Sequence, residues 1–293
     1  MTVQELYPDF DQLWDYGEPT ETAEKFQALL AQAQNNPPYH AELLTQLART
    51  QGLQRKFDEA HQLLDQVEVM LTNDMARAHI RYLLERGRTF NSSGEKDKAR
   101  ALFLSAWNLG KEKGEDFHAI DAAHMMAIVE PLEEQLLWNL TALALTEKTP
   151  DQRAKKWIGS LNNNIGWTFF DQKHYEKALD HFYQSLAYQE SVGNESMIRV
   201  GRWCVAKTLR VLGRVEEALT MQEALLKTYE ADGEQDEYVS EEMGECLLAL
   251  DRIKEARPHF ASAYEALSQD SWLVEHEPDR IERIKQLGQA STD

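Results

Sequence analysis

The stretch "NNNIGWTFFDQKHYEKALDHFYQSLAYQ", residues 162–189, decides the fold of this 293-residue chain. Gly166 comes twelve residues before Ala178, and aromatic residues follow Gly166 and stand on both sides of Ala178. Small residues at such a spacing let two antiparallel helices approach closely where they cross. The stretch therefore predicts a helical hairpin, and we expect its aromatic side chains to fill the space between this hairpin and its neighbours.

The same twelve-residue offset returns in four further segments. The matching pairs are Ala48 and Ala60, Gly87 and Ala99, Ala206 and Ala218, and Gly244 and Ala256. The second alanines of successive pairs lie 39, 40 and 38 residues apart wherever neighbouring pairs follow directly. Residues 116–148 fill the one gap as a degenerate repeat with a shortened turn. Self-similarity at a fixed period is typical of repeat architectures.

Composition agrees with helices throughout. Leu, Ala, Glu, Gln and Lys are good helix formers, and no run of alternating β-branched residues predicts a strand. We therefore expect an all-α fold, a right-handed superhelical solenoid of about seven hairpins with a polar capping helix at its end. It should be one domain over residues 1–293, with an N-terminal capping hairpin at 10–34, repeats at 41–268 and a C-terminal cap at 269–293.

This pattern resembles the tetratricopeptide repeat. Gly166, Phe169, Tyr175, Ala178 and Phe182 match the family's eighth, eleventh, seventeenth, twentieth and twenty-fourth positions. The other hairpins match less fully; Gln222, for example, stands where Phe or Tyr is usual. The period exceeds the roughly 34 residues of the plain repeat. In the length of its repeat, the chain is similar to the longer repeats of kinesin light chains and bacterial peptide-sensing regulators.

The resemblance implies a concave groove lined by the first helix of each hairpin. Carried over by position, the groove includes Glu42, Thr45 and Arg49, and its candidate peptide-binding residues are Arg81, Arg88, Asn163, Asn164, Trp167, Phe170, Trp203, Lys207 and Arg210. In relatives an Asn near these positions bonds the backbone of an extended peptide, which makes Asn163 and Asn164 the matching candidates. Arg and Trp are also enriched at binding hot spots. The alternative is that the tryptophans pack between repeats and the arginines pair with neighbouring acids.

Charge narrows the choice of partner. The formal net charge is −19, and residues 1–36 and 230–293 hold most of the excess acid. Binding to phosphates needs clustered Lys and Arg, so we expect neither nucleic acid nor a membrane as the partner. The first residues carry no basic and apolar signal pattern, no stretch is apolar enough to span a membrane, and Cys204 and Cys246 cannot form a disulfide framework. These features favour a cytoplasmic protein.

No motif predicts catalysis, a metal or a cofactor. The pairs His118 with His124 and His174 with His181 are poorly spaced for a metal, so we expect surface histidines. Adjacent acids such as Glu241 and Glu242 are expected on solvated faces.

The sequence thus predicts a non-enzymatic scaffold that binds a protein or peptide, acidic ones included, in its groove. Two alternatives remain: a structural solenoid that self-associates, and a regulator that senses a small effector or a signalling peptide.

Overall fold

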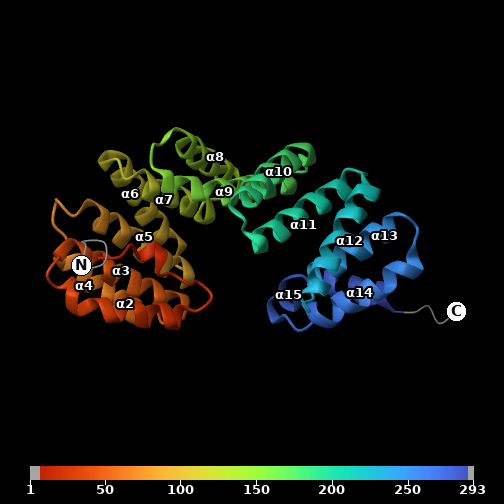
Figure 1. Ribbon diagram of the computed structural model, residues 1–293, viewed down its shortest axis with the longest axis horizontal. Coiled ribbons are helices and arrows are strands. Elements are labelled where there is room, and N and C mark those ends of the chain that lie inside the picture. The colour runs from red at the N-terminus through yellow and green to blue at the C-terminus, as the bar shows by residue number, and fades with distance from the viewer. Residues whose placement is uncertain (1–6, 290–293) are drawn as a thin grey trace. The chain divides into compact units, whose positions relative to one another are not determined.

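The computed structural model describes residues 7–289, and every regular element among them is a helix. The all-α prediction is confirmed. The elements, labelled in Figure 1, are η1 (Phe10–Gln12), α2 (Pro19–Ala33), α3 (Pro37–Leu53), α4 (Phe57–Met70), α5 (Ala76–Ser92), α6 (Lys96–Lys113), α7 (Asp116–Val129), α8 (Leu132–Lys148), η2 (Gln152–Lys156), α9 (Trp157–Asp171), α10 (Tyr175–Val192), α11 (Glu195–Val211), α12 (Val215–Ala231), α13 (Glu237–Ala249), α14 (Ile253–Leu267), α15 (Ser271–His276) and α16 (Pro278–Gly288).

The chain divides into two compact units, and the boundary falls between Leu161 and Asn162, inside α9. In the first unit, α2 packs on α3, and the hairpins α3–α4, α5–α6 and α7–α8 follow in order. In the second unit, α10 packs on α11, the hairpins α11–α12 and α13–α14 follow, and α16 packs on α14. Each predicted pair of small residues belongs to one hairpin, so the period read from the sequence is the period of the helices.

The glycine at the start of each strong pair makes room for a phenylalanine of its own hairpin. A Cβ added to Gly166 would lie 2.6 Å from the ring of Phe182, which is fully buried. The same relation joins Gly87 to Phe103, at 2.5 Å, and Gly244 to Phe260, at 2.9 Å. The expectation that these rings fill the space between hairpins was therefore wrong for this position, because the ring lies across the crossing inside the hairpin.

The hairpin with Ala206 departs from this arrangement. Its buried partner position holds Gln222, whose side-chain amide is fully buried and makes no hydrogen bond within the described residues. Since alanine leaves less room than glycine, an aromatic ring is replaced here by a thinner side chain. Burying the amide of Gln222 without hydrogen bonds lowers the stability of this hairpin.

The turns inside the hairpins share one backbone conformation. A left-handed residue follows the first helix in five of them, and in two of these it is glycine, Gly94 with φ 92° and Gly213 with φ 82°. Lys173 adopts the same conformation, at φ 61°, although it has a Cβ atom that disfavours positive φ. In the degenerate repeat only Glu130 and Pro131 separate α7 from α8, so its turn is shortened as expected.

Both cysteines, Cys204 and Cys246, are free and buried. Burial raises the pKa of each thiol to about 12. Within residues 7–289, no helix is both long and apolar enough to cross a lipid bilayer.

Candidate functional site

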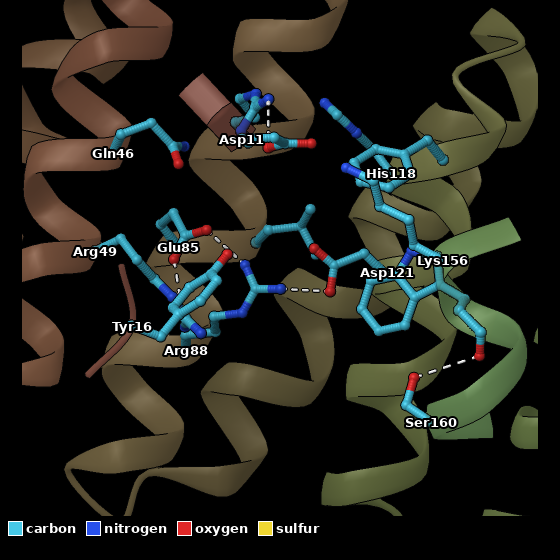
Figure 2. A pocket seen from close by; sticks show the side chains of 14 residues that line it. Asp11, Tyr16, Gln46, Arg49, Glu85, Arg88, His118, Asp121, Lys156 and Ser160 are labelled. Atoms are coloured by element: carbon cyan, nitrogen blue, oxygen red, sulfur yellow. Dashed lines mark hydrogen bonds and ion pairs between the residues drawn. The ribbon is translucent and has the colours of Figure 1, made fainter. Parts of the chain in front are cut away.

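A cavity of about 420 Å³ opens on the first unit, on the side formed by the first helices of its hairpins (Figure 2). α3 contributes Gln46 and Arg49, and η1 contributes Asp11. The remaining lining residues come from α5, α7, the start of α9 and the segments beside them: Tyr16, Arg81, Leu84, Glu85, Arg88, Phe117, His118, Asp121, Lys156, Trp157 and Ser160. Every one of these residues precedes the boundary at Leu161, so the cavity belongs to the first unit alone.

Ion pairs occupy the centre of the cavity. Figure 2 shows Arg88 between Glu85 and Asp121. Its Nη1 donates to Glu85 at 2.5 Å, and its Nη2 donates to Asp121 on the next first helix. Arg81 lies 3.1 Å from a carboxylate oxygen of Glu42 and 3.9 Å from one of Asp11. These pairs join η1, α3, α5 and α7, so they fix the walls of the cavity as well as its charge.

His118 is the most deeply buried polar residue of the cavity. It is 2% exposed, and its Nε2 has no hydrogen-bond partner within the described residues. Burial, with smaller contributions from the positive charges of Arg81 and Arg153, holds its pKa well below the usual value. His118 is therefore neutral at pH 7. The expectation of a surface histidine was wrong here, because His118 faces the inner side of the repeat and not its outer side.

Trp157 also lines the cavity, at the start of α9. Its ring contacts Phe117 and His124, with centroids 6.5 Å and 5.1 Å apart. Its indole Nε1 is buried without a hydrogen-bond partner in residues 7–289. Native proteins seldom leave a buried polar atom unpaired. The residues lining this cavity hold five such atoms within the described chain: Nε1 of Trp157, Nε2 of His118, Nε of Arg81, Nε of Arg88 and Oε2 of Glu85.

Of the nine predicted groove residues, the structure brings Arg81 and Arg88 into this cavity. Arg49, which the positional transfer also placed on the inner surface, lies there too. The other seven belong to the second unit. The role of all nine in binding stays a prediction.

In the second unit, aromatic side chains form a row across three successive first helices. Trp167 lies 5.3 Å from Phe170 and 5.9 Å from Trp203, measured between ring centroids. The Trp203 indole donates to the backbone oxygen of Tyr238, on α13, at 3.0 Å. All are partly buried. These rings therefore also pack successive repeats together, the alternative that the sequence left open.

The two cations predicted for the groove of the second unit are paired with one carboxylate. Lys207 lies 3.6 Å from a carboxylate oxygen of Glu242, and Arg210 donates to both oxygens of the same group. Glu242 is 1% exposed, and neighbouring Glu241 is buried in an ion pair with Arg280. The expectation that these two acids lie on a solvated face was wrong, because α13 turns them toward cations of α11 and α16.

The predicted asparagines lie on α9. The Oδ1 of Asn163 accepts a weak hydrogen bond from the Cys204 thiol, at 3.6 Å. Asn164 is partly buried, and its backbone oxygen accepts a hydrogen bond from the hydroxyl of Thr168. Neither residue lines the cavity of the first unit.

Nine residues of the cavity were missed by the sequence analysis: Asp11, Tyr16, Gln46, Glu85, Phe117, His118, Asp121, Lys156 and Trp157. Three of them lie on α7, the first helix of the degenerate repeat, where the twelve-residue offset gave no reference position for the transfer. The spacing of His118 and Asp121, three residues apart on one helical face, was the available signal. No group of three or more His, Cys, Asp or Glu in the described part of the chain is placed to hold a metal ion.

Similarity to known proteins was found between structures and not between sequences. The sequence matches no family model and no curated protein. One similar solved structure is a signal-transduction ATPase with numerous domains and a tetratricopeptide repeat sensor, from Pyrococcus horikoshii: TM-score 0.60, 17% identity, 97% of this chain and 40% of that one. The chain thus spans well under half the length of that ATPase.

Two further structures match over most of both chains. Aspartyl phosphate phosphatase F from Bacillus subtilis gives a TM-score of 0.58 at 13% identity, over 99% of this chain and 82% of that one. The quorum sensor NprR from B. thuringiensis gives 0.58 at 14%, over 98% and 92%. At such low sequence identities, these structures are evidence for a shared fold and not for a shared function or shared binding residues.

Proposed function

Starting from a chain with the tetratricopeptide-repeat fold, we propose that it is a non-enzymatic scaffold that binds a peptide or a partner segment in the cavity of its first unit. The observation that carries the proposal is the cavity itself, walled by ion pairs and lined by residues with buried polar atoms that have no hydrogen-bond partner in the described chain, Nε2 of His118 and Nε1 of Trp157 among them. The inner faces of α9 and α11, with Trp167 and Trp203, are proposed as a second contact surface in the second unit.

A second candidate function is a regulator that senses a signalling peptide. It is supported by the likeness, over 99% of this chain and 89% of the other, to the structure of NprR in complex with its cognate peptide NprX, with a TM-score of 0.56. Both functions place a peptide on the chain. They differ in whether binding changes the activity of a further protein.

A photo-crosslinking amino acid at Tyr16 tests the proposal. Tyr16 lines the cavity and is 63% exposed, so the aromatic p-benzoylphenylalanine fits in its place. Tyr183, on α10 and 41% exposed, is the matched control outside the cavity. We expect irradiation in cell extract to join a distinct segment of another protein to position 16 and not to position 183. Adducts between two copies of this chain would favour the self-associating alternative instead.

The captured segment, made as a synthetic peptide, should then bind the purified chain directly. Ser160→Trp places a large ring at the cavity wall and should weaken this binding about tenfold or more, equivalent to about 1.4 kcal/mol. Ser191→Trp, at an exposed position on α10, should leave it unchanged. Equal affinity for both variants would place the peptide elsewhere on the chain and refute the cavity as its site.

A further inference from the structure

The second helix of the degenerate repeat, α8, turns apolar side chains outward. It packs on α7 at one edge of the first unit (Figure 1). Leu132, Leu137 and Leu140 are 48%, 59% and 39% exposed, and no other helix within residues 7–289 exposes as many large apolar side chains. Its inner side buries two polar residues, Asn139 and Thr146. A surface helix normally has the reverse arrangement, so the outer side of α8 has the character of a contact surface.

The outward residues of α8 have the spacing of paired helices. Leu137, Leu140 and Ala144 are three and four residues apart, which places them on one face of the helix. Ala144 is exposed, as the two leucines are. Residues 135–146 contain no Asp, Glu, Lys or Arg. Apolar residues at this spacing form the seam between two packed helices, so the outer face of α8 suits another helix.

The two ends of α8 carry opposite charges. Glu133 and Glu134 lie in its first turn, are exposed, and make no ion pair within the described chain. At the other end, Lys148 is exposed and also makes no ion pair there, and Lys155 donates to a backbone oxygen of the last turn at 2.7 Å. Two cations against the one carboxylate of Glu147 leave this end positive. The partner helix should therefore be negative where α8 is positive, and the reverse.

A second copy of α8, running in the opposite direction, meets both requirements. Leu137 and Ala144 lie equally far from one midpoint of the helix, directly after Leu140, and so do Glu133 and Lys148. A two-fold axis at that midpoint sets each Leu137 against Ala144 of the second copy, a large side chain against a small one. It also brings each Glu133 near Lys148 of the second copy. A two-fold interface makes every such contact twice, so the face is complementary to itself.

We propose that the chain forms a two-fold dimer in which the outer face of α8 packs antiparallel against α8 of a second copy. This inference goes beyond the proposed function and does not depend on it, because no residue of α8 lines the cavity. The contact leaves the lining of both cavities unchanged, so one dimer carries two of the proposed peptide sites. One 17-residue helix from each copy is a small interface by the standard of stable complexes. The dimer should therefore dissociate on dilution.

Analytical ultracentrifugation of the full chain over a range of concentrations tests the proposal. We expect the mean mass to rise from that of a monomer toward that of a dimer. Leu137→Glu places a charge in the apolar seam twice per dimer and should raise the dissociation constant about tenfold or more. Val69→Glu is the matched control, because Val69, on α4, is 87% exposed and lies outside this face. It should leave dimerisation unchanged. Circular dichroism checks that both variants are folded.

Exchanging the end charges tests the antiparallel direction. Glu133→Lys alone and Lys148→Glu alone each set like charges against each other, at two places in the dimer. Either change should raise the dissociation constant about two- to tenfold. The double variant Glu133→Lys/Lys148→Glu restores opposite charges at both places and should return the dissociation constant to near the wild-type value. A double variant that dimerises no better than the single ones would refute the antiparallel pairing.

The occupant of the face is identified by a photo-crosslinker. With p-benzoylphenylalanine at position 137, we expect irradiation of the purified chain to join α8 of one copy to α8 of another, as mapped by mass spectrometry. A chain that stays monomeric at every concentration overturns the proposal, as does a dimer that Leu137→Glu leaves intact. In cell extract, an adduct to a different protein at this position would assign the face to another partner and refute the second copy. All of these outcomes leave the proposed function of the cavity standing.

Discussion

At the scale of single residues, the protonation state of buried His118 affects the stability of the folded protein. His118 is neutral in the folded protein because burial and nearby arginines depress its pKa, whereas in the unfolded chain it titrates near 6.5. Below that pH the unfolded state binds the proton and the folded state resists it. The stability that neutral His118 contributes is therefore present above pH 6.5 and is lost as the pH falls.

We expect His118→Gln to flatten the acid dependence of stability. The wild-type protein should lose up to about 1.4 kcal/mol more than the variant for each pH unit below 6.5. Urea unfolding at pH 7.5 and 5.5 measures the difference, and the other histidines cancel because both proteins share them. His174→Gln, at an exposed site, should keep the wild-type slope. Parallel slopes for His118→Gln and the wild type would contradict the prediction.

Single residues also mark the limit of what the sequence could predict. The positional transfer put Arg88 and Arg210 on inner faces, but it could not say which acid each would meet. Arg210 meets Glu242 on the next first helix, and Arg88 meets Asp121, in each case more than thirty residues away. Such pairing is decided by how neighbouring helices align, which a one-dimensional period does not encode.

At the scale of helices, the sequence predicted far more. The spacing of small residues located both helices of five hairpins, because close approach at a crossing restricts residue size wherever it occurs. At α7, on which part of the cavity wall lies, the offset was not found, so that repeat was inferred from the gap in the period and gave no position for its inner side chains. The spacing did not predict which side chain packs against the glycine. Gly166 packs against the ring of Phe182 rather than against Ala178.

The Gly–Phe contact can be tested by adding one methyl group. Gly166→Ala should destabilise the protein by about 1–2 kcal/mol, because the new Cβ would lie 2.6 Å from a fully buried ring that has no room to move. Gly52→Ala is the control. Its Cβ would come no closer than 3.9 Å to Thr89, so the helix should gain stability or stay unchanged. Urea unfolding at neutral pH measures both. Equal effects from the two variants would show that the ring yields.

At the scale of the whole chain, the two units have separate hydrophobic clusters. One cluster includes Phe26, Leu64 and Phe103, and another includes Phe182, Leu209 and Phe260. In repeat proteins each repeat depends mainly on its neighbours, so damage at one place should spread only a short way. Whether the chain behaves as the single domain expected from its sequence stays a prediction.

Hydrogen exchange read by mass spectrometry distinguishes local from global unfolding. Gly87→Ala crowds Phe103 in the first unit, where its Cβ would lie 2.5 Å from the ring. We expect faster exchange in α5 and α6 and in their neighbours α3 and α7, with α13 and α14 unchanged. Equal acceleration in both units would instead indicate one cooperative domain. Gly52→Ala again serves as the control.

The two buried cysteines make the protein convenient to label. Because burial raises both thiol pKa values to about 12, the two cysteines are protonated at pH 7, whereas the thiolate is the form that reacts with maleimides and disulfide reagents. A cysteine introduced at an exposed position would thus be modified selectively without replacing Cys204 or Cys246. Fluorophores or spin labels for following ligand capture can be attached to the otherwise native sequence.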